Sequence, residues 1–95
     1  MNDPTAIGQP VLLNMDDVRV DPVVALKTPA AVSTRREMLP FIRWQGAIHV
    51  ACANIGDVGG LAALQRFYDL PLKAEAAEPQ SLKRAISRLY SVSKP

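Results

Sequence analysis

The clearest hydrophobic pattern lies between Met38 and Ala53, where two apolar runs flank the Gln45–Gly46 pair. The first run, Leu39–Trp44, indicates a short strand with Leu39 and Phe41 on one face and Ile42 and Trp44 on the other. The second run, Ala47–Ala53, is apolar on both faces, which is typical of a strand covered on two sides. The pattern therefore predicts a buried β-hairpin around which the other elements pack.

Two short helices are predicted before the hairpin, each from a capping residue followed by proline. In Asp21-Pro22 and Thr28-Pro29, the first side chain can accept from free amides of the first turn, and proline suits the first helical position. The second of these helices is expected to span Pro29–Glu37. Pro40 disfavours helix at the residue before it, so the chain should become extended there.

One helix, one strand and a last helix are predicted after the hairpin. Asp57 is expected to cap the first helix. The alternation of apolar and charged residues in Leu72–Ala76 is typical of a half-exposed edge strand. Glu78-Pro79 opens the last helix, whose apolar stripe is the most regular in the chain. That stripe consists of Leu82, Ala85, Ile86, Leu89 and Tyr90.

Gly59 and Gly60 fall in the first turn of the helix after Asp57. Glycine destabilises a helix interior by about 1 kcal/mol relative to alanine. The pair therefore leaves two interpretations open: the first turn is frayed, or it packs unusually close to a neighbouring element.

Together these elements predict a small α+β domain, a three-stranded sheet built on a central hairpin and covered by three to four helices. We expect the domain to span residues 17–91, with a flexible N-terminal tail at 1–16 and a tail or linker at 92–95. The stretch Val11–Val20 fits either a loose strand at each end of a turn or an extended chain laid over the domain.

Composition restricts the class of protein further. The chain is 48% hydrophobic but only 5% aromatic, so its core must be built mainly from small aliphatic side chains. A single cysteine excludes an internal disulfide and suggests a reducing compartment. No apolar run approaches the ~20 residues of a membrane span, and no signal peptide is visible, so a cytoplasmic protein is expected.

The residues give no support for catalysis, a metal or a cofactor. On a strand, a separation of three places His49 and Cys52 on opposite faces, where they cannot form a nucleophile–base pair. These are the one imidazole and the one thiol, too few for a structural metal site. There is no phosphate-binding loop of the ATPase type. The net charge of +2 is too small to indicate a nucleic-acid partner.

The candidate binding residues are basic. They form two groups in the sequence, Arg35, Arg36 and Arg43 around the hairpin and Lys83, Arg84 and Arg88 on the last helix. Arginine pairs well with carboxylates and phosphates, so an acidic or phosphate-bearing partner is one interpretation and a solvated surface is the other. Trp44 beside Arg43 is either an exposed interface anchor or a cover for the edge of the core.

Several short motifs of this sequence occur in the same order as in a known protein family. They are Leu39-Pro40, then Val50 to Asn54 with Asp57, then Leu61, Leu64 and Phe67, then Leu70-Pro71-Leu72 with Ala76, and finally Leu82, Ala85, Ile86, Arg88, Leu89 and Tyr90. With these motifs the chain resembles the N-terminal accessory domain of type II secretion and type IV pilus assembly ATPases (GspE/PilB type, MshEN-like C-terminal subdomain).

The resemblance implies a non-enzymatic interaction or regulatory module that docks to a protein, either the inner-membrane platform protein or the secretion or pilus ATPase. The alternative it implies is a cyclic di-GMP sensor, attached to or acting with a secretion ATPase or a membrane glycosyltransferase. The chain departs from the family in two respects, since it has neither Walker motifs nor the "RLG..L...G" pattern associated with cyclic di-GMP. No residue here inherits a role from either motif.

Overall fold

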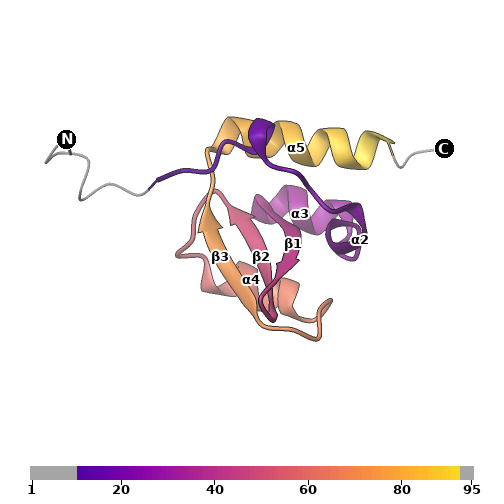
Figure 1. Ribbon diagram of the computed structural model, residues 1–95, viewed down its shortest axis with the longest axis vertical. Coiled ribbons are helices and arrows are strands. Elements are labelled where there is room, and N and C mark those ends of the chain that lie inside the picture. Colours follow the sequence, from indigo (N-terminus) through magenta and orange to yellow (C-terminus); the bar gives the residue numbers. More distant parts are fainter. Residues whose placement is uncertain (1–10, 93–95) are drawn as a thin grey trace, which may run out of the picture.

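The computed structural model describes residues 11–92, and Figure 1 shows its sheet and the helices around it. In chain order the elements are η1 (Met15–Asp17, a turn of 3-10 helix), α2 (Pro22–Ala25), α3 (Ala30–Arg36), β1 (Met38–Trp44), β2 (Ala47–Cys52), α4 (Val58–Gln65), β3 (Leu72–Ala76) and α5 (Pro79–Val92). The predicted α+β class, with its three-stranded sheet and four α-helices, is confirmed over the described residues.

The sheet has the order β1-β2-β3, with β1 antiparallel and β3 parallel to the central β2. Gln45 and Gly46 connect β1 to β2 with φ values of +50° and +76°. Two positive φ angles are typical of the tight hairpin turns whose twist matches that of the strands. Leu72–Ala76 is the edge strand that its alternating pattern predicted.

A bulge in β1 changes which residues share a face. The register with β2 shifts between Pro40 and Ile42, which leaves Phe41 as the extra residue. Ile42 therefore packs with the same cluster as Leu39 and Phe41, and not on the opposite face as strict alternation predicted. The Phe41 carbonyl also accepts a hydrogen bond from the Asp21 amide at 2.8 Å, which ties the segment before α2 to the sheet.

The sheet separates two apolar clusters, with α5 and the N-terminal segment on one side and α4 on the other (Figure 1). The first cluster contains Met15, Ala25, Leu39, Phe41, Ala51, Ala77, Leu82, Ala85 and Ile86. The second contains Val24, Met38, Ile48, Val50, Cys52, Leu64 and Tyr68. Because β2 contributes to both clusters, the prediction of a strand covered on two sides is confirmed.

The described part of the segment expected as an N-terminal tail packs on the domain. The Leu13 amide donates to the Ala76 carbonyl at 2.9 Å, and the Glu78 amide donates to the Leu13 carbonyl at 2.8 Å. Met15 is 1% exposed. The structure combines the two arrangements left open for this stretch, since Leu13 forms a β-bridge with Ala77, Met15–Asp17 form a turn of 3-10 helix, and the segment lies over the domain. Residues 1–10 and 93–95 lie outside the described residues.

The surroundings of Gly60 show why a glycine stands in the first turn of α4. Its amide donates to the Asp57 side chain at 2.9 Å, and a Cβ on Gly60 would approach the Met38 Cε to 2.8 Å as well as the Asp57 carboxylate. At Gly59 the nearest atom to such a Cβ is 3.8 Å away. The close-packing interpretation is therefore confirmed for Gly60, and the predicted cap at Asp57 is confirmed with it.

Two tyrosine hydroxyls hold the turn between α2 and α3. Tyr68 donates to the Val24 carbonyl at 2.6 Å, and its oxygen lies 3.0 Å from the Thr28 Oγ1. Tyr90 donates to the Thr28 carbonyl at 2.6 Å. Desolvation raises the pKa of the Tyr68 phenol, so the donor is retained at physiological pH. The bonds of Tyr68 tie this turn to the segment after α4, and the bond of Tyr90 ties it to α5.

Candidate functional site

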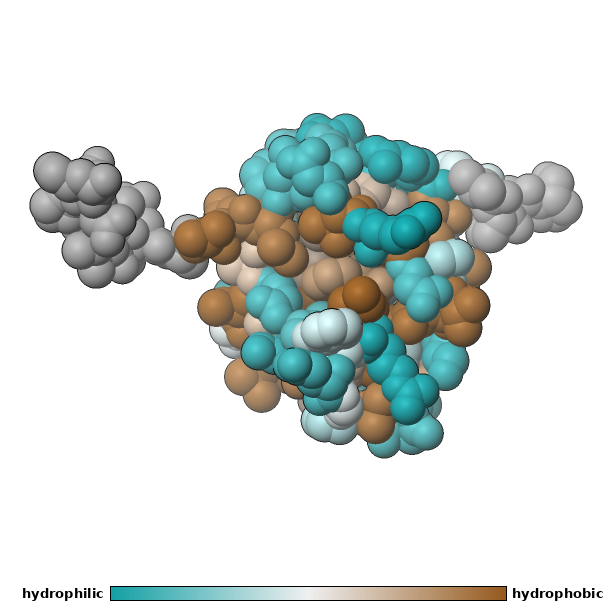
Figure 2. Space-filling view, viewed as in Figure 1, coloured by the Kyte–Doolittle hydropathy of each residue, from teal (hydrophilic) through white to brown (hydrophobic). Residues whose placement is uncertain are grey.

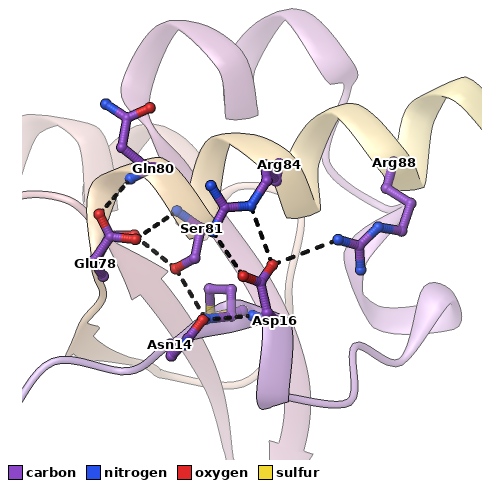
Figure 3. A network of polar contacts seen from close by, with 8 residues as sticks. Asn14, Asp16, Glu78, Gln80, Ser81, Arg84 and Arg88 are labelled. Carbon is purple, nitrogen blue, oxygen red and sulfur yellow. Dashed lines mark hydrogen bonds and ion pairs between the residues drawn. The ribbon is translucent and has the colours of Figure 1, made fainter.

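The outer face of α5 meets the N-terminal segment in a network of polar contacts (Figure 3). At the start of the helix, the Glu78 carboxylate accepts from the Ser81 amide at 2.7 Å and from the Gln80 amide at 2.9 Å. Hydrogen bonds from these two amides hold the pKa of the Glu78 carboxyl below its usual value. The Ser81 hydroxyl in turn accepts from the Met15 amide at 3.0 Å, which anchors η1 on α5.

Asp16 of η1 pairs with Arg84 and Arg88, which lie one turn apart on α5. Arg84 donates to both carboxylate oxygens, with Nη2–Oδ2 and Nε–Oδ1 distances of 2.7 and 3.3 Å. The Arg88 Nη2 lies 3.6 Å from the Oδ1, too far for a strong hydrogen bond. The bonds from Arg84 lower the pKa of the Asp16 carboxyl, and the same pairing raises the pKa of Arg84.

An apolar groove lies next to this pair, between α5 and the segment that leads through α2. Its volume is about 470 Å³, and it is lined by Met15, Val18, Val20, Pro22, Leu26, Ala85, Arg88 and Leu89. We call it the α5 groove. Arg88 is the one charged residue in this lining. Figure 2 shows apolar residues in a band below the hydrophilic residues of the upper edge, with hydrophilic residues again over the lower part of this face.

The rim of the α5 groove is also apolar. Leu26 lines the groove and is 44% exposed, whereas Val23, which is 72% exposed, lines a different hollow with Arg43. Exposed apolar residues grouped at a hollow are a common feature of sites that receive a partner. The sequence showed the cations of α5 but not this groove, because its two walls are far apart along the chain.

The structure separates the other predicted binding residues. Lys83 points to a different hollow, of about 520 Å³, which it lines with Thr34, Glu37, Ile86 and Ser87 between α3 and α5. Arg35 and Arg36 are exposed in the last turn of α3, before β1. Arg43 lies near the other end of this seven-residue strand, roughly 20 Å away at the usual rise per residue.

Trp44 ends β1 and is 57% exposed, outside both apolar clusters. Its neighbour Arg43 lines a small hollow of about 200 Å³ together with Asp21, Lys27 and Asp69, among others. Two cations and two carboxylates there balance in charge. The charges at this end of the hairpin therefore cancel, and they favour an anion less than the arginines of α5 do.

His49 and Cys52 lie on opposite faces of β2, as their spacing predicted. The His49 Nδ1 is 2.8 Å from the Glu75 Oε2, a contact that sequence reasoning missed because the parallel pairing of β2 with β3 was not visible. Cys52 is buried, and desolvation raises the pKa of its thiol to about 11. A thiol that stays protonated is a poor nucleophile.

The described residues contain no group of three or more His, Cys, Asp or Glu side chains placed to hold a metal ion. Within the same part of the chain, no helix has both the length and the apolar character that a membrane span needs.

A family model described as the MshEN domain matches residues 7–95. The chain belongs to the MshEN domain family. The predicted resemblance to the N-terminal region of type II secretion and type IV pilus ATPases is confirmed by this match. An MshEN domain is a small accessory domain, and the described residues of this one form an α+β fold.

A solved structure, that of MshE with cdg (cyclic di-GMP), has a TM-score of 0.74 to this MshEN domain. The two are 18% identical in sequence, and the likeness covers 90% of this chain and 62% of the other. It shows a shared fold. The chain thus spans less than two thirds of the protein it matches. No curated protein matches the sequence.

The pairing of Asp16 predicts an acid-sensitive contribution to stability. Because its folded pKa lies below the usual 3.8, this contribution is full above that pH and is lost as the pH falls through the folded pKa. Glu78 should behave likewise below its usual 4.5. We expect Asp16→Asn to lower the Tm slightly at neutral pH and to reduce the fall of the Tm on acidification.

Melting curves of both proteins between about pH 7 and pH 2 test this expectation, since the Asp16 contribution should vanish at the acid end. The two Tm profiles should converge there. Profiles that stay parallel throughout would show that the pair with Arg84 does not stabilise the folded state.

Proposed function

We propose that this MshEN domain is a non-enzymatic docking module of a type II secretion or type IV pilus system. Its partner is a protein, either the inner-membrane platform protein or the secretion or pilus ATPase, and it acts in the cytoplasm. The observation that carries the proposal is the α5 groove, an open apolar hollow with Arg88 at its side and Leu26 on its rim. Apolar surface beside an arginine is typical of protein interfaces.

The thiol and the imidazole of β2, one on each face of the sheet, favour docking over chemistry. The Cys52 thiol is buried with a raised pKa, and the His49 ring is held by Glu75. Neither group is presented in a hollow with a second reactive side chain. We assign docking to the face formed by α5 and the N-terminal segment because this face carries the α5 groove.

The test is calorimetry of the full chain with each of two purified partners. These are the cytoplasmic region of the platform protein and the ATPase of the same system. We expect saturable binding to one of them, with a dissociation constant on the order of micromolar or tighter. Absence of binding to both, with a folded protein verified by circular dichroism, would contradict the proposal.

A second candidate function is the sensing of cyclic di-GMP, because the matched structure is that of MshE with this ligand. Here a phosphate would have to replace Asp16 between Arg84 and Arg88, since the carboxylate already occupies the donors of Arg84. Calorimetry with cyclic di-GMP up to high micromolar concentration tests it. Asp16→Asn should strengthen any binding at this place, and no heat from either protein would remove the candidate.

A further inference from the structure

We propose that the α5 groove receives an amphipathic helix of a partner protein, with its apolar residues in the groove and a carboxylate paired with Arg88. The inference rests on the proposed docking function and specifies the surface and the chemistry of the occupant. The juxtaposition that supports it is one exposed, weakly engaged arginine inside an otherwise apolar lining.

The walls of the groove favour a helix over an extended segment. One wall is α5, whose backbone groups are bonded within the helix. In the other wall the Val18 amide donates to Met15 and the Asp21 amide donates to Phe41, which leaves, within this described stretch, only the two residues between them with amides that have no backbone partner. An extended partner could pair with this two-residue stretch only, far less than the sheet edge that strand addition uses, and burying its remaining unpaired peptide groups is unfavourable. A helix satisfies its own backbone and presents only side chains, as in other grooves that bind helices.

The state of Arg88 favours a carboxylate on that helix. Its side chain is 62% exposed, and in the described part of the chain its polar contact is the one 3.6 Å approach to Asp16. The Asp16 carboxylate bonds mainly to Arg84, and the Asp21 carboxylate accepts from the Val23 amide. Arg88 therefore keeps most of its five donors, which suit a planar carboxylate in two-point contact.

Docking would also strengthen this ion pair. The groove is lined by aliphatic side chains around Arg88, so a helix laid along it would remove water from the guanidinium and its partner. Opposite charges attract more strongly as the effective dielectric constant falls. A lysine or arginine at the same place on the helix would be repelled. The charge thus selects among amphipathic helices that would fit the apolar lining equally well.

The probe is a synthetic 18-residue amphipathic peptide with leucines at i, i+3, i+4 and i+7 and one glutamate beside that stripe. It is titrated into the full chain, labelled with ¹⁵N. We expect shifts of the amide signals of Val18, Leu26 and Leu89, and a peptide with lysine for the glutamate should bind about tenfold more weakly. Arg88→Gln should remove this preference, and Leu26→Asp should abolish binding.

Lys83→Gln is the matched control, because Lys83 is exposed on the same helix but lines the hollow on the α3 side. It should change peptide affinity by less than about twofold. Melting curves verify that each variant is folded. Shifts located elsewhere, equal effects of Arg88→Gln and Lys83→Gln, no preference between the two peptides, or no binding would each overturn the inference.

The same variants separate this inference from the proposed function. If a partner protein binds the chain but Arg88→Gln and Leu26→Asp bind as tightly as the unaltered protein, docking stands and the helix-in-groove arrangement is wrong. If the peptide binds in the groove while neither partner protein binds, the groove is correct and the assignment to a secretion or pilus system is wrong.

Discussion

Leu82→Ala is expected to lower the free energy of unfolding by about 2–5 kcal/mol, the largest effect that we predict for a single substitution in this domain. Leu82 is 0% exposed and lies in the cluster that attaches α5 to the sheet. Several members of that cluster are alanines (Ala51, Ala77 and Ala85), whose side chains cannot move to fill the space that a leucine leaves. The cavity should therefore remain largely open.

The loss would be a large fraction of the total. Folded domains have about 0.05–0.15 kcal/mol of stability per residue, which gives roughly 4–12 kcal/mol for the described part of this chain. Denaturation in urea followed by circular dichroism measures the change. Leu12→Ala is the control, because Leu12 is 48% exposed and should change stability by less than about 0.5 kcal/mol. Similar small losses for both variants would show that α5 is not packed as described.

Gly60→Ala should destabilise the domain by about 1–3 kcal/mol, although alanine is intrinsically the better helix former. The added Cβ would meet the Met38 Cε at 2.8 Å and would also press on the Asp57 carboxylate that caps α4. Both contacts lie at the junction of α4 with β1, where Met38 is fully buried. Relief would require Met38 or the cap to move.

Gly59→Ala provides an internal comparison in the same turn of α4. Nothing lies closer than 3.8 Å to a Cβ at Gly59, so this substitution should gain about 0.5–1 kcal/mol from helix propensity. The two variants, measured in the same urea titration, should therefore change stability in opposite directions. A gain in both would show that Gly60 is not in close contact with Met38.

The elements of this fold were largely predictable because their signals are local. The caps at Asp21 and Asp57 act on amides two or three residues away, and both are present in the structure. Alternation along Leu72–Ala76 and the regular stripe of the last helix depend only on which face of an element is buried. Such preferences act within a few residues, so they can be read without knowing the topology.

The candidate site was only half predictable. Arg84 and Arg88 were identified as binding residues from their type and position. Their contact with Asp16 was not visible in the sequence, because Asp16 lies 68 positions before Arg84. Arg35, Arg36 and Arg43 are near each other in sequence and were grouped on that basis. A strand separates them in space, because extended chain covers a large distance in few residues.

By itself, the sequence determined the α+β class, the approximate positions of the α-helices and strands and the list of cations, and its motifs indicated the family. The tertiary structure alone decided three further features. These are the parallel β3 that brings Glu75 to His49, the bulge that turns Ile42 inward, and the laying of residues 13–17 on α5. The last of these creates the α5 groove. The first and the last depend on contacts between segments that are far apart in the chain, and the bulge depends on how the two strands of the hairpin pair; these free energies become available only after the elements have come together.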